Sequence, residues 1–160
     1  MLEYSENNTL DNLDKAILAA LQQNGRISNV ELARQINLSP PAIHARLKRL
    51  EQHGLIQQYT ALLNREKAGY DMLCFVHLNL QLHHHEKVET VRTTIQAMPE
   101  VLECYHLTGS FDYLLKVVIR NQKDLERFVM HQLTPIPGIA RIQTSIVLTE
   151  VKSTTVLPLD

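Results

Sequence analysis

The chain has 160 residues and a formal net charge of −1; apolar and charged residues make up 44% and 21% of it. These values are typical of a globular protein with one ordinary domain or two small ones, and exclude a disordered chain. No apolar run approaches the roughly 20 residues of a membrane span. The polar, acidic start MLEYSENNTL is unlike a secretory signal, so we expect a cytoplasmic protein without membrane contacts. The overall charge does not by itself indicate a nucleic-acid partner.

The first third of the chain predicts short helices. An apolar repeat at helical spacing ends at Asn24-Gly25; its members are Leu13, Ile17 and Leu21. Ser28 followed by Glu31 then predicts a capping box, in which two side chains satisfy free N–H groups at a helix start. Asn37 suits the left-handed end of that second helix.

The next stretch, LSPPAIHARLKRLEQHG (38–54), begins with two prolines, although proline usually interrupts a helix. Here Ser39 suits the N-cap, and Pro40 and Pro41 fall in the first turn, where a missing N–H costs nothing. The prolines therefore start a helix, and its core stripe is Ile43, Leu47 and Leu50. Residues 28–54 together predict a helix-turn-helix.

The face opposite that core stripe carries small residues first and cations later. A DNA major groove accepts such a face, since its leading turn approaches base edges and its cations reach phosphates. From the pattern alone, a solvated helical face explains the cations equally well. In the DNA-binding hypothesis the base-facing residues, next to Pro40 in the leading turn, are Pro41, Ala42, Ala45, Lys48 and Arg49. The residues expected at phosphates are Ser39, His44 and Arg46, with Arg26 and Ser28 at the start of the preceding helix.

The rest of the chain predicts mostly strands. Residues 56–63 (IQQYTALL) predict a strand, and 64–72 a linker. Strands are then expected at 73–82, 101–107, 113–119 and 139–148, with helices around 88–98 and 121–133, in the β-α-β-β-α-β order of ferredoxin-like domains. In that fold the third strand lies between the first and the second. Cys74 and Cys104 would then be roughly 9–10 Å apart, so free thiols are expected.

Several blocks, in order along the chain, resemble the Lrp/AsnC (feast/famine) transcription regulators. They are LDNLDKAIL (10–18), NGRISNVELARQINLSPPAIHARLKRLEQHGLI (24–56), PEV (99–101), LTGSFDYLLKV (107–117), PGI (137–139) and TSIVLTEVKSTTVLPL (144–159). The resemblance implies an α+β protein: a winged helix-turn-helix domain (1–63), a linker (64–72), a ferredoxin-like, RAM-type effector and oligomerisation domain (73–150), and a tail (151–160). It also implies a nucleoid-associated, sequence-specific regulator of promoter DNA, built from dimers that assemble into tetramers or octamers.

Members of this family often bind an amino acid between C-terminal domains. The turn TGSFD (108–112) resembles their ligand site: the amides of Gly109 and Ser110 suit a carboxylate, and Asp112 suits an ammonium group. The flanking Phe111 and Tyr113 belong to the same candidate site, and Thr144 and Ser145 would close it from a neighbouring chain. From the spacing alone, an ordinary hairpin turn is the better explanation.

Other functional classes find little support. Three consecutive residues, His83 to His85, point in different directions, so no metal site is expected. The sequence has no nucleophile–base pair and no phosphate-binding glycine loop, so we expect neither an enzyme nor a cofactor. The alternative to an effector-controlled regulator is a chromosome-organising protein that binds DNA broadly without an effector; a ratio of specific to non-specific affinity near unity would identify it.

Overall fold

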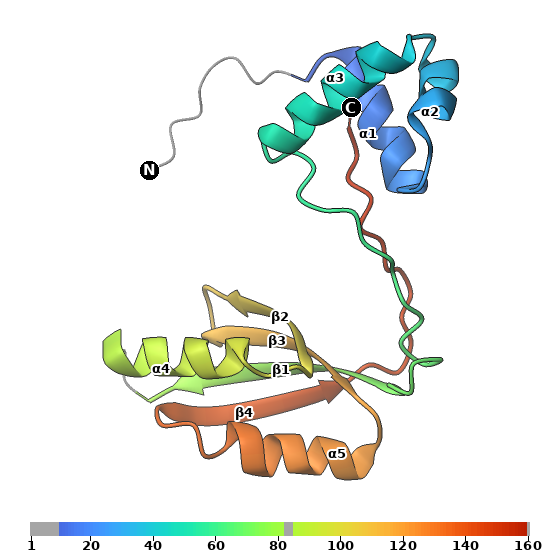
Figure 1. Cartoon of the computed structure of the whole chain (residues 1–160). Coiled ribbons are helices and arrows are strands. Elements are labelled where there is room, and N and C mark those ends of the chain that lie inside the picture. Colours follow the sequence, from blue (N-terminus) through green and yellow to red (C-terminus); the bar gives the residue numbers. More distant parts are fainter. Residues whose placement is uncertain (1–9, 82–84, 160) are drawn as a thin grey trace. The chain divides into compact units, whose positions relative to one another are not determined.

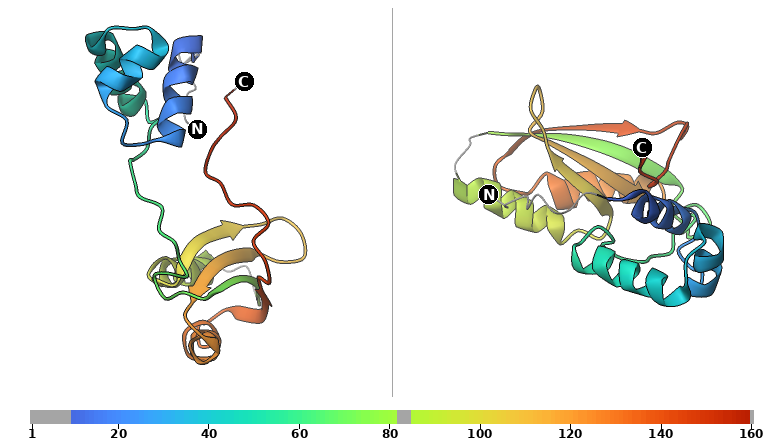
Figure 2. Two further views of the ribbon diagram at one scale, coloured as in Figure 1. Left: turned by 90° about the vertical axis from the view of Figure 1, so that its right-hand side faces the viewer. Right: turned by 90° about the horizontal axis from the view of Figure 1, so that it is seen from above.

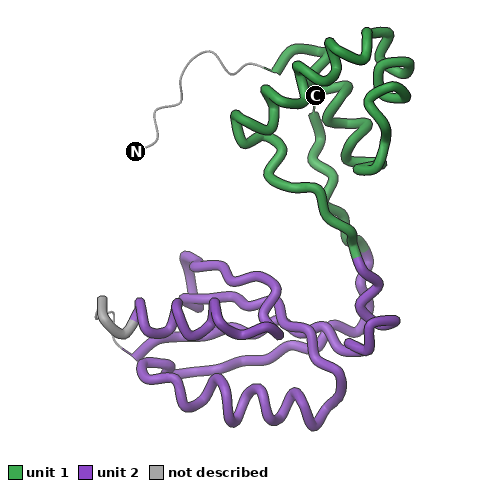
Figure 3. Tube along the Cα trace, in the orientation of Figure 1, with its two compact units in different colours: residues 1–62, 152–160 green, residues 63–151 purple. Residues whose placement is uncertain are grey.

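The structure is a computed structural model that describes residues 10–81 and 85–159, with the backbone alone for residues 85–87. The chain divides into two compact units, coloured separately in Figure 3: unit 1 comprises residues 1–62 and 152–160, and unit 2 comprises residues 63–151. Each unit encloses its own hydrophobic core. None of the helices in the described ranges is long and apolar enough to cross a membrane.

Unit 1 contains the helix-turn-helix that the sequence predicts. Its helices are α1 (Asn12–Gln23), α2 (Asn29–Ile36) and α3 (Pro40–Gln52), labelled in Figure 1. The Ser39 hydroxyl accepts a hydrogen bond from the Ala42 N–H at 3.4 Å, and both prolines lie in the first turn of α3. The prediction that the prolines start this helix is therefore confirmed. Helix α2 ends as predicted at Asn37, whose φ of 58° is left-handed.

The predicted capping box of α2 is only half present. Ser28 accepts a hydrogen bond from the Glu31 N–H at 3.1 Å, but the Glu31 carboxylate pairs with Arg34 at 2.9 Å. The prediction of a reciprocal bond is wrong because Arg34, three residues further on, offers that carboxylate a charged partner. A reciprocal box occurs instead at α1, where Asp11 accepts from the Asp14 N–H at 2.7 Å and Asp14 accepts from the Asp11 N–H at 3.4 Å.

The core of unit 1 forms where the apolar stripes of its helices meet. Ile17 of α1, Leu32 of α2 and Ile43 of α3 are fully buried there. The end of the chain joins this unit: the main chain of Leu157 exchanges two hydrogen bonds with the Gln22 side chain, at 3.1 and 2.6 Å. Leu159 also packs against the core. The tail therefore stabilises the same unit as the first helices.

The segment after α3 differs from its prediction. The sequence predicts a strand over residues 56–63, but in the structure this segment pairs with no strand of the described ranges. Leu62 and Leu63 are 76% and 81% exposed. The prediction is wrong because a strand requires a partner for its backbone hydrogen bonds, and none of the described segments pairs with residues 56–63.

Unit 2 has the predicted β-α-β-β-α-β order, with an antiparallel sheet in the strand order β2-β3-β1-β4. Its strands are β1 (Met72–Leu80), β2 (Val101–His106), β3 (Tyr113–Ile119) and β4 (Ile139–Ile146). Its helices are α4 (His85–Gln96) and α5 (Gln122–Arg127), which continues into the π-helical turn η1 (Phe128–Leu133). The ferredoxin-like prediction is thus confirmed. Cys74 and Cys104 are free thiols on strands that β3 separates, also as predicted.

Both helices of unit 2 cover the same face of its sheet, as the two views in Figure 2 show. Val76 and Leu115 point to that face and are buried with Ile95 of α4 and Phe128 of η1. Because side chains alternate along a strand, the neighbours of these core residues within each strand point to the opposite face of the sheet, which no described helix covers. We name this surface the open sheet face; its members include Phe75, His77, Tyr105, Leu114, Arg141 and Gln143.

Candidate DNA-binding and ligand-binding sites

Helix α3 presents one face that is free to meet a partner. Pro41, Ala45 and Lys48 are exposed on the side opposite to the buried Ile43 and Leu47. In the described part of the chain the Lys48 ammonium makes no hydrogen bond or ion pair. Other residues predicted to approach DNA and exposed along this helix and its cap are Ser39, Pro40 and His44. The side chains at the leading turn are small, the property that the predicted approach of this helix to base edges requires.

The two arginines of α3 bind carboxylates of α1 instead. Arg46 Nη1 lies 2.7 Å from Asp11 Oδ2 and 2.7 Å from Asp14 Oδ1. Arg49 Nη2 lies 2.5 Å from Asp14 Oδ2. Asp14 is only 2% exposed, so its hydrogen bonds are shielded from water. Charge-assisted hydrogen bonds in such an environment are strong. Asp11, Asp14, Arg46 and Arg49 form the α1–α3 ion cluster, which ties the exposed face of α3 to a fixed orientation on α1.

The α1–α3 ion cluster contains two carboxylates and two guanidinium groups and is therefore neutral. The pKa of Asp11 is lowered, first by the hydrogen bond from the Asp14 backbone N–H and then by the one from Arg46. The pKa of Arg46 is raised, and the main cause is the hydrogen bond that Arg46 donates to Asp11. The Arg49 side chain is 51% exposed, whereas the Arg46 side chain is 24% exposed. Arg49 can thus still approach a partner, whereas Arg46 mainly holds α3 on α1.

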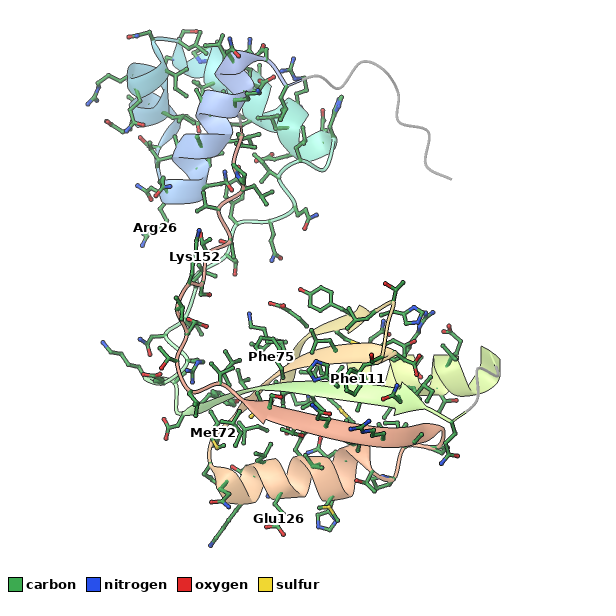
Figure 4. All side chains as sticks on the ribbon, turned by 180° about the vertical axis from the view of Figure 1, so that it is seen from behind. Arg26, Met72, Phe75, Phe111, Glu126 and Lys152 are labelled. Atoms are coloured by element: carbon green, nitrogen blue, oxygen red, sulfur yellow. The ribbon has the colours of Figure 1, made fainter. Side chains whose placement is uncertain are left out.

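The remaining residues predicted for DNA lie at the start of α2 and in the first turn of α3. Arg26 is exposed, and its side chain is labelled in Figure 4. The Ser28 hydroxyl oxygen caps α2 by accepting the Glu31 N–H, and its proton remains able to donate to a phosphate. Ala42, predicted to face the bases, is half-buried rather than fully exposed.

The turn TGSFD joins β2 to β3 at one end of the sheet. Gly109 has a φ of 124°, a conformation that favours glycine. Asp112 Oδ2 accepts the Leu80 N–H at 2.7 Å, at the point where the pairing of β1 with β4 shifts register. The carbonyl of Ser110 accepts from Asn79 Nδ2 at 2.7 Å. The turn is therefore anchored on the end of β1, with one oxygen of Asp112 committed to that anchor.

The two aromatic residues of the predicted ligand site point to opposite faces of the sheet. The Phe111 ring lies 4.6 Å from the His77 ring and 5.7 Å from the guanidinium of Arg141, both on the open sheet face. Tyr113 is buried on the helix-covered face, where its hydroxyl accepts a bond from Arg92 Nε at 3.1 Å. Within one chain, these two rings cannot line the same pocket.

Thr144 and Ser145 lie apart from the turn within one chain. They pair with Val76 and Phe75, whereas the Asp112 N–H donates to the carbonyl of Leu78. Since a strand rises about 3.3 Å per residue, the separation along β1 is roughly 7–10 Å. The structure thus brings Gly109, Ser110, Phe111 and Asp112 together and leaves Thr144 and Ser145 for a separate contact.

Comparison with known proteins identifies the family. Residues 10–57 match the model of winged helix-turn-helix DNA-binding domains, and residues 73–157 match that of the Lrp/AsnC ligand binding domain. The chain belongs to the Lrp/AsnC family. Transcriptional regulator AzlB of Bacillus subtilis is 38% identical over 151 residues, which cover 94% of this chain and 96% of that protein. The leucine-responsive regulatory protein of Escherichia coli K12 is 39% identical over 143 residues, 89% of this chain and 87% of that protein.

Solved structures of Lrp/AsnC regulators share the fold. A transcriptional regulator of Neisseria meningitidis, solved as a complex with L-methionine, is 39% identical with a TM-score of 0.92 over 95% of this chain and 98% of that one. Escherichia coli AsnC is 31% identical with a TM-score of 0.87 over 94% of this chain and 99% of that one. The present Lrp/AsnC protein is accordingly a DNA-binding transcription regulator with a ligand-binding domain, and not an enzyme.

Sequence reasoning about this Lrp/AsnC protein missed the acidic half of the α1–α3 ion cluster. The signal was present: Asp11 and Asp14, three residues apart before an apolar stripe, are a capping-box pattern. The roles of Asn79 and Arg141 at the turn could be found only once strand pairing was known. The described residues contain no converging group of metal ligands. His83, His84 and the His85 side chain, considered for metal binding, lie outside them.

Proposed function

We propose that this protein is an amino-acid-responsive regulator that reads specific operators through α3. The observation that carries the proposal is the exposed face of α3, with small residues at its leading turn and, further along, Lys48, which pairs with none of the described residues. Pro41, Ala42, Ala45, Lys48 and Arg49 meet the bases in this proposal. Ser39, His44, Arg26 and Ser28 approach phosphates, while Arg46 acts mainly through α1.

A protomer with so few free cations neutralises few phosphates. Because affinity for DNA rises with each neutralised phosphate, useful affinity requires at least two copies of α3 on one operator. We propose a dimer formed through the open sheet face, on which Tyr105 is exposed and which no helix of the described ranges covers. Such dimers would assemble into tetramers or octamers and bind half-sites one or more helical turns apart, on nucleoid DNA in the cytoplasm.

The proposed effector site is the TGSFD turn. The amides of Gly109 and Ser110 hold a carboxylate, and Asp112 Oδ1 holds the ammonium group while Oδ2 stays bound to the Leu80 N–H. Thr144 and Ser145 of a neighbouring chain close the site, since within one chain they lie away from the turn. The methionine complex of the meningococcal relative supports an apolar or sulfur-containing amino acid as effector.

Thermal unfolding with each standard amino acid, for the wild-type protein and an Asp112→Ala variant, tests the effector site. A ligand selective for the folded state and present at 100 times its dissociation constant adds about 2.7 kcal/mol. We expect one or two apolar or sulfur-containing amino acids to raise the midpoint, and the variant to abolish the rise that these amino acids cause. No shift with any amino acid would contradict the effector proposal.

Operator selection from random DNA, followed by binding at fixed salt, tests the DNA proposal. We expect the selected site to bind several hundred times more tightly than unrelated DNA. A variant that is strictly monomeric should lose most of this affinity. A specificity ratio near unity would contradict the regulator proposal, and a monomer that bound with full affinity would contradict the dimer argument.

A further inference from the structure

Unit 2 contains a hollow of about 420 Å³ at the end of the sheet away from the TGSFD turn. Its polar walls come from the loop before β1, the start of β2, the end of β3, α5 and η1: Tyr70, Glu100, Arg120, Asp124, Arg127 and Gln132. The TGSFD turn precedes β3 and the hollow lies at the end of that strand, so the two are roughly 20 Å apart. The volume is within the range of small-molecule sites. We name it the Glu100 hollow.

Glu100 has an unmet requirement in this hollow. Its Oε1 accepts only a long bond of 3.4 Å from Gln132 Nε2, and among the described residues its buried Oε2 has no hydrogen-bond partner. A buried carboxylate oxygen without a donor is costly, and such groups are rare in folded proteins. The group that would satisfy it best is a cationic N–H donor.

The cations that line the hollow do not supply that donor. Arg127 donates to Asp124 at 2.5 Å, on α5 itself. The guanidinium of Arg120 lies 5.3 Å from the centre of the Tyr70 ring, and its N–H groups donate to no acceptor within the described ranges. The formal charges of the four charged side chains, Glu100, Arg120, Asp124 and Arg127, sum to zero. Among the described residues, Glu100 Oε2 lacks a donor and the Arg120 guanidinium lacks an acceptor. A wall of this kind suits a zwitterion better than a single ion.

The π-helical turn η1 contributes to the same hollow. The Thr134 N–H donates to the carbonyl of Val129, five residues back, at 2.9 Å. One extra residue per turn rotates the following side chains by about 100° relative to an α-helix. Phe128 and Leu133 stay buried in the core, while Gln132 reaches Glu100. Turns of this type occur frequently at functional sites.

We propose that the Glu100 hollow is a second ligand site, which binds a small polar amino acid as its zwitterion. The ammonium group of the ligand donates to Glu100 Oε2, and its carboxylate accepts from the guanidinium of Arg120. This site uses no residue of the TGSFD turn. It can therefore be tested whether or not that turn binds an effector.

Calorimetric titration of the full-length protein with each standard amino acid tests this proposal, in an Asp112→Ala background that removes the turn site. We expect at least one polar amino acid to bind, with one ligand per chain, and Glu100→Gln to weaken it at least tenfold. Arg120→Gln should weaken it comparably. Glu126→Gln, which changes an exposed glutamate of α5 (labelled in Figure 4), should leave it unchanged. The N-acetyl derivative of the same amino acid, which lacks the ammonium group, should not bind.

Two further readouts separate binding from folding. Without ligand, Glu100→Gln should unfold at the same temperature as the wild type or higher, because the oxygen it replaces has no partner. The side-chain amide signal of Gln132 in an NMR titration should move with the amino acid. The proposal is overturned if no amino acid binds in the Asp112→Ala background, or if Glu100→Gln binds as tightly as its parent. A failure of the turn site alone would remove only the response that Asp112→Ala abolishes.

Discussion

Asp14→Asn is the substitution for which the structure makes the sharpest prediction. The substitution keeps the shape of the side chain but removes its negative charge. Asp14 is 2% exposed, and its carboxylate lies 2.7 Å from Arg46 Nη1 and 2.5 Å from Arg49 Nη2. Removing one partner of a buried ion pair costs about 3–5 kcal/mol. Arg49 is half exposed and Arg46 keeps Asp11, so we expect the lower end, about 3 kcal/mol. For a domain of this size that corresponds to about 12–24 °C in the unfolding midpoint of unit 1.

Asp11→Asn is the matched control for this prediction. Asp11 binds the same Arg46 nitrogen at the same 2.7 Å, but its side chain is 48% exposed. Solvent screening makes exposed pairs weak, so this variant should lose far less stability than Asp14→Asn. Scanning calorimetry of the full chain, in which the transition of unit 1 can be followed beside that of unit 2, measures both. Equal losses in the two variants would refute the argument that burial of Asp14 gives the α1–α3 ion cluster its strength.

Three other predictions concern charge, pH and the tail. Arg26→Ala should lower DNA affinity and reduce the slope of log K against log salt by about 0.9 per bound protomer, because Arg26 is proposed to neutralise a phosphate; Arg46→Ala should lower the stability of unit 1 and leave that slope unchanged, as salt titrations of operator binding will show. Partial burial and a hydrogen bond to the Glu51 carboxylate raise the pKa of Tyr59, which is 52% exposed, to about 12 from an ordinary 10.0. The folded state thus binds this proton more tightly, so the stabilisation is complete below pH 10.0 and is lost as pH rises toward 12; the difference between ultraviolet titrations of the wild type and of Tyr59→Phe should show a tyrosine that ionises late, and normal ionisation in that difference would contradict this. Gln22→Ala removes both hydrogen bonds to the tail and should speed hydrogen exchange of the tail amide it accepts, while α3 amides keep their protection.

Much of this fold can be predicted because its signals are local. The caps at Ser39 and Asn121, the prolines in the first turn of α3 and the left-handed Asn37 each depend on residues within one helical turn. The period-2 pattern of β1 likewise places Val76 and Leu78 in the core. Such features need no knowledge of the rest of the chain.

The candidate sites are less predictable because their chemistry depends on contacts between distant residues. The local sequence around Arg46 and Arg49 is the same whether these arginines contact a phosphate or Asp14. Asp14 precedes Arg46 by 32 positions and Arg49 by 35. A helical wheel can separate exposed from buried faces but cannot name the neighbour on the shoulder between them. The π-helical turn η1 adds one residue to a helix, and its sequence FVMHQL contains no proline or glycine from which the turn could be predicted.

The tail extends this reasoning to a segment with no pattern of its own. VKSTTVLPLD (151–160) has neither helical nor alternating periodicity, so nothing local predicts where it goes. Its fixed points are a side-chain amide 135 positions earlier and a core built by the first three helices. A single glutamine can hold it because the Gln22 side chain carries both a donor and an acceptor, which match the carbonyl and N–H of Leu157. The same pairing would be available to Gln23, but that residue lies on the exposed side of α1 and Gln22 on the half-buried one. The register of one helix therefore decides which of two identical neighbours holds the end of the chain.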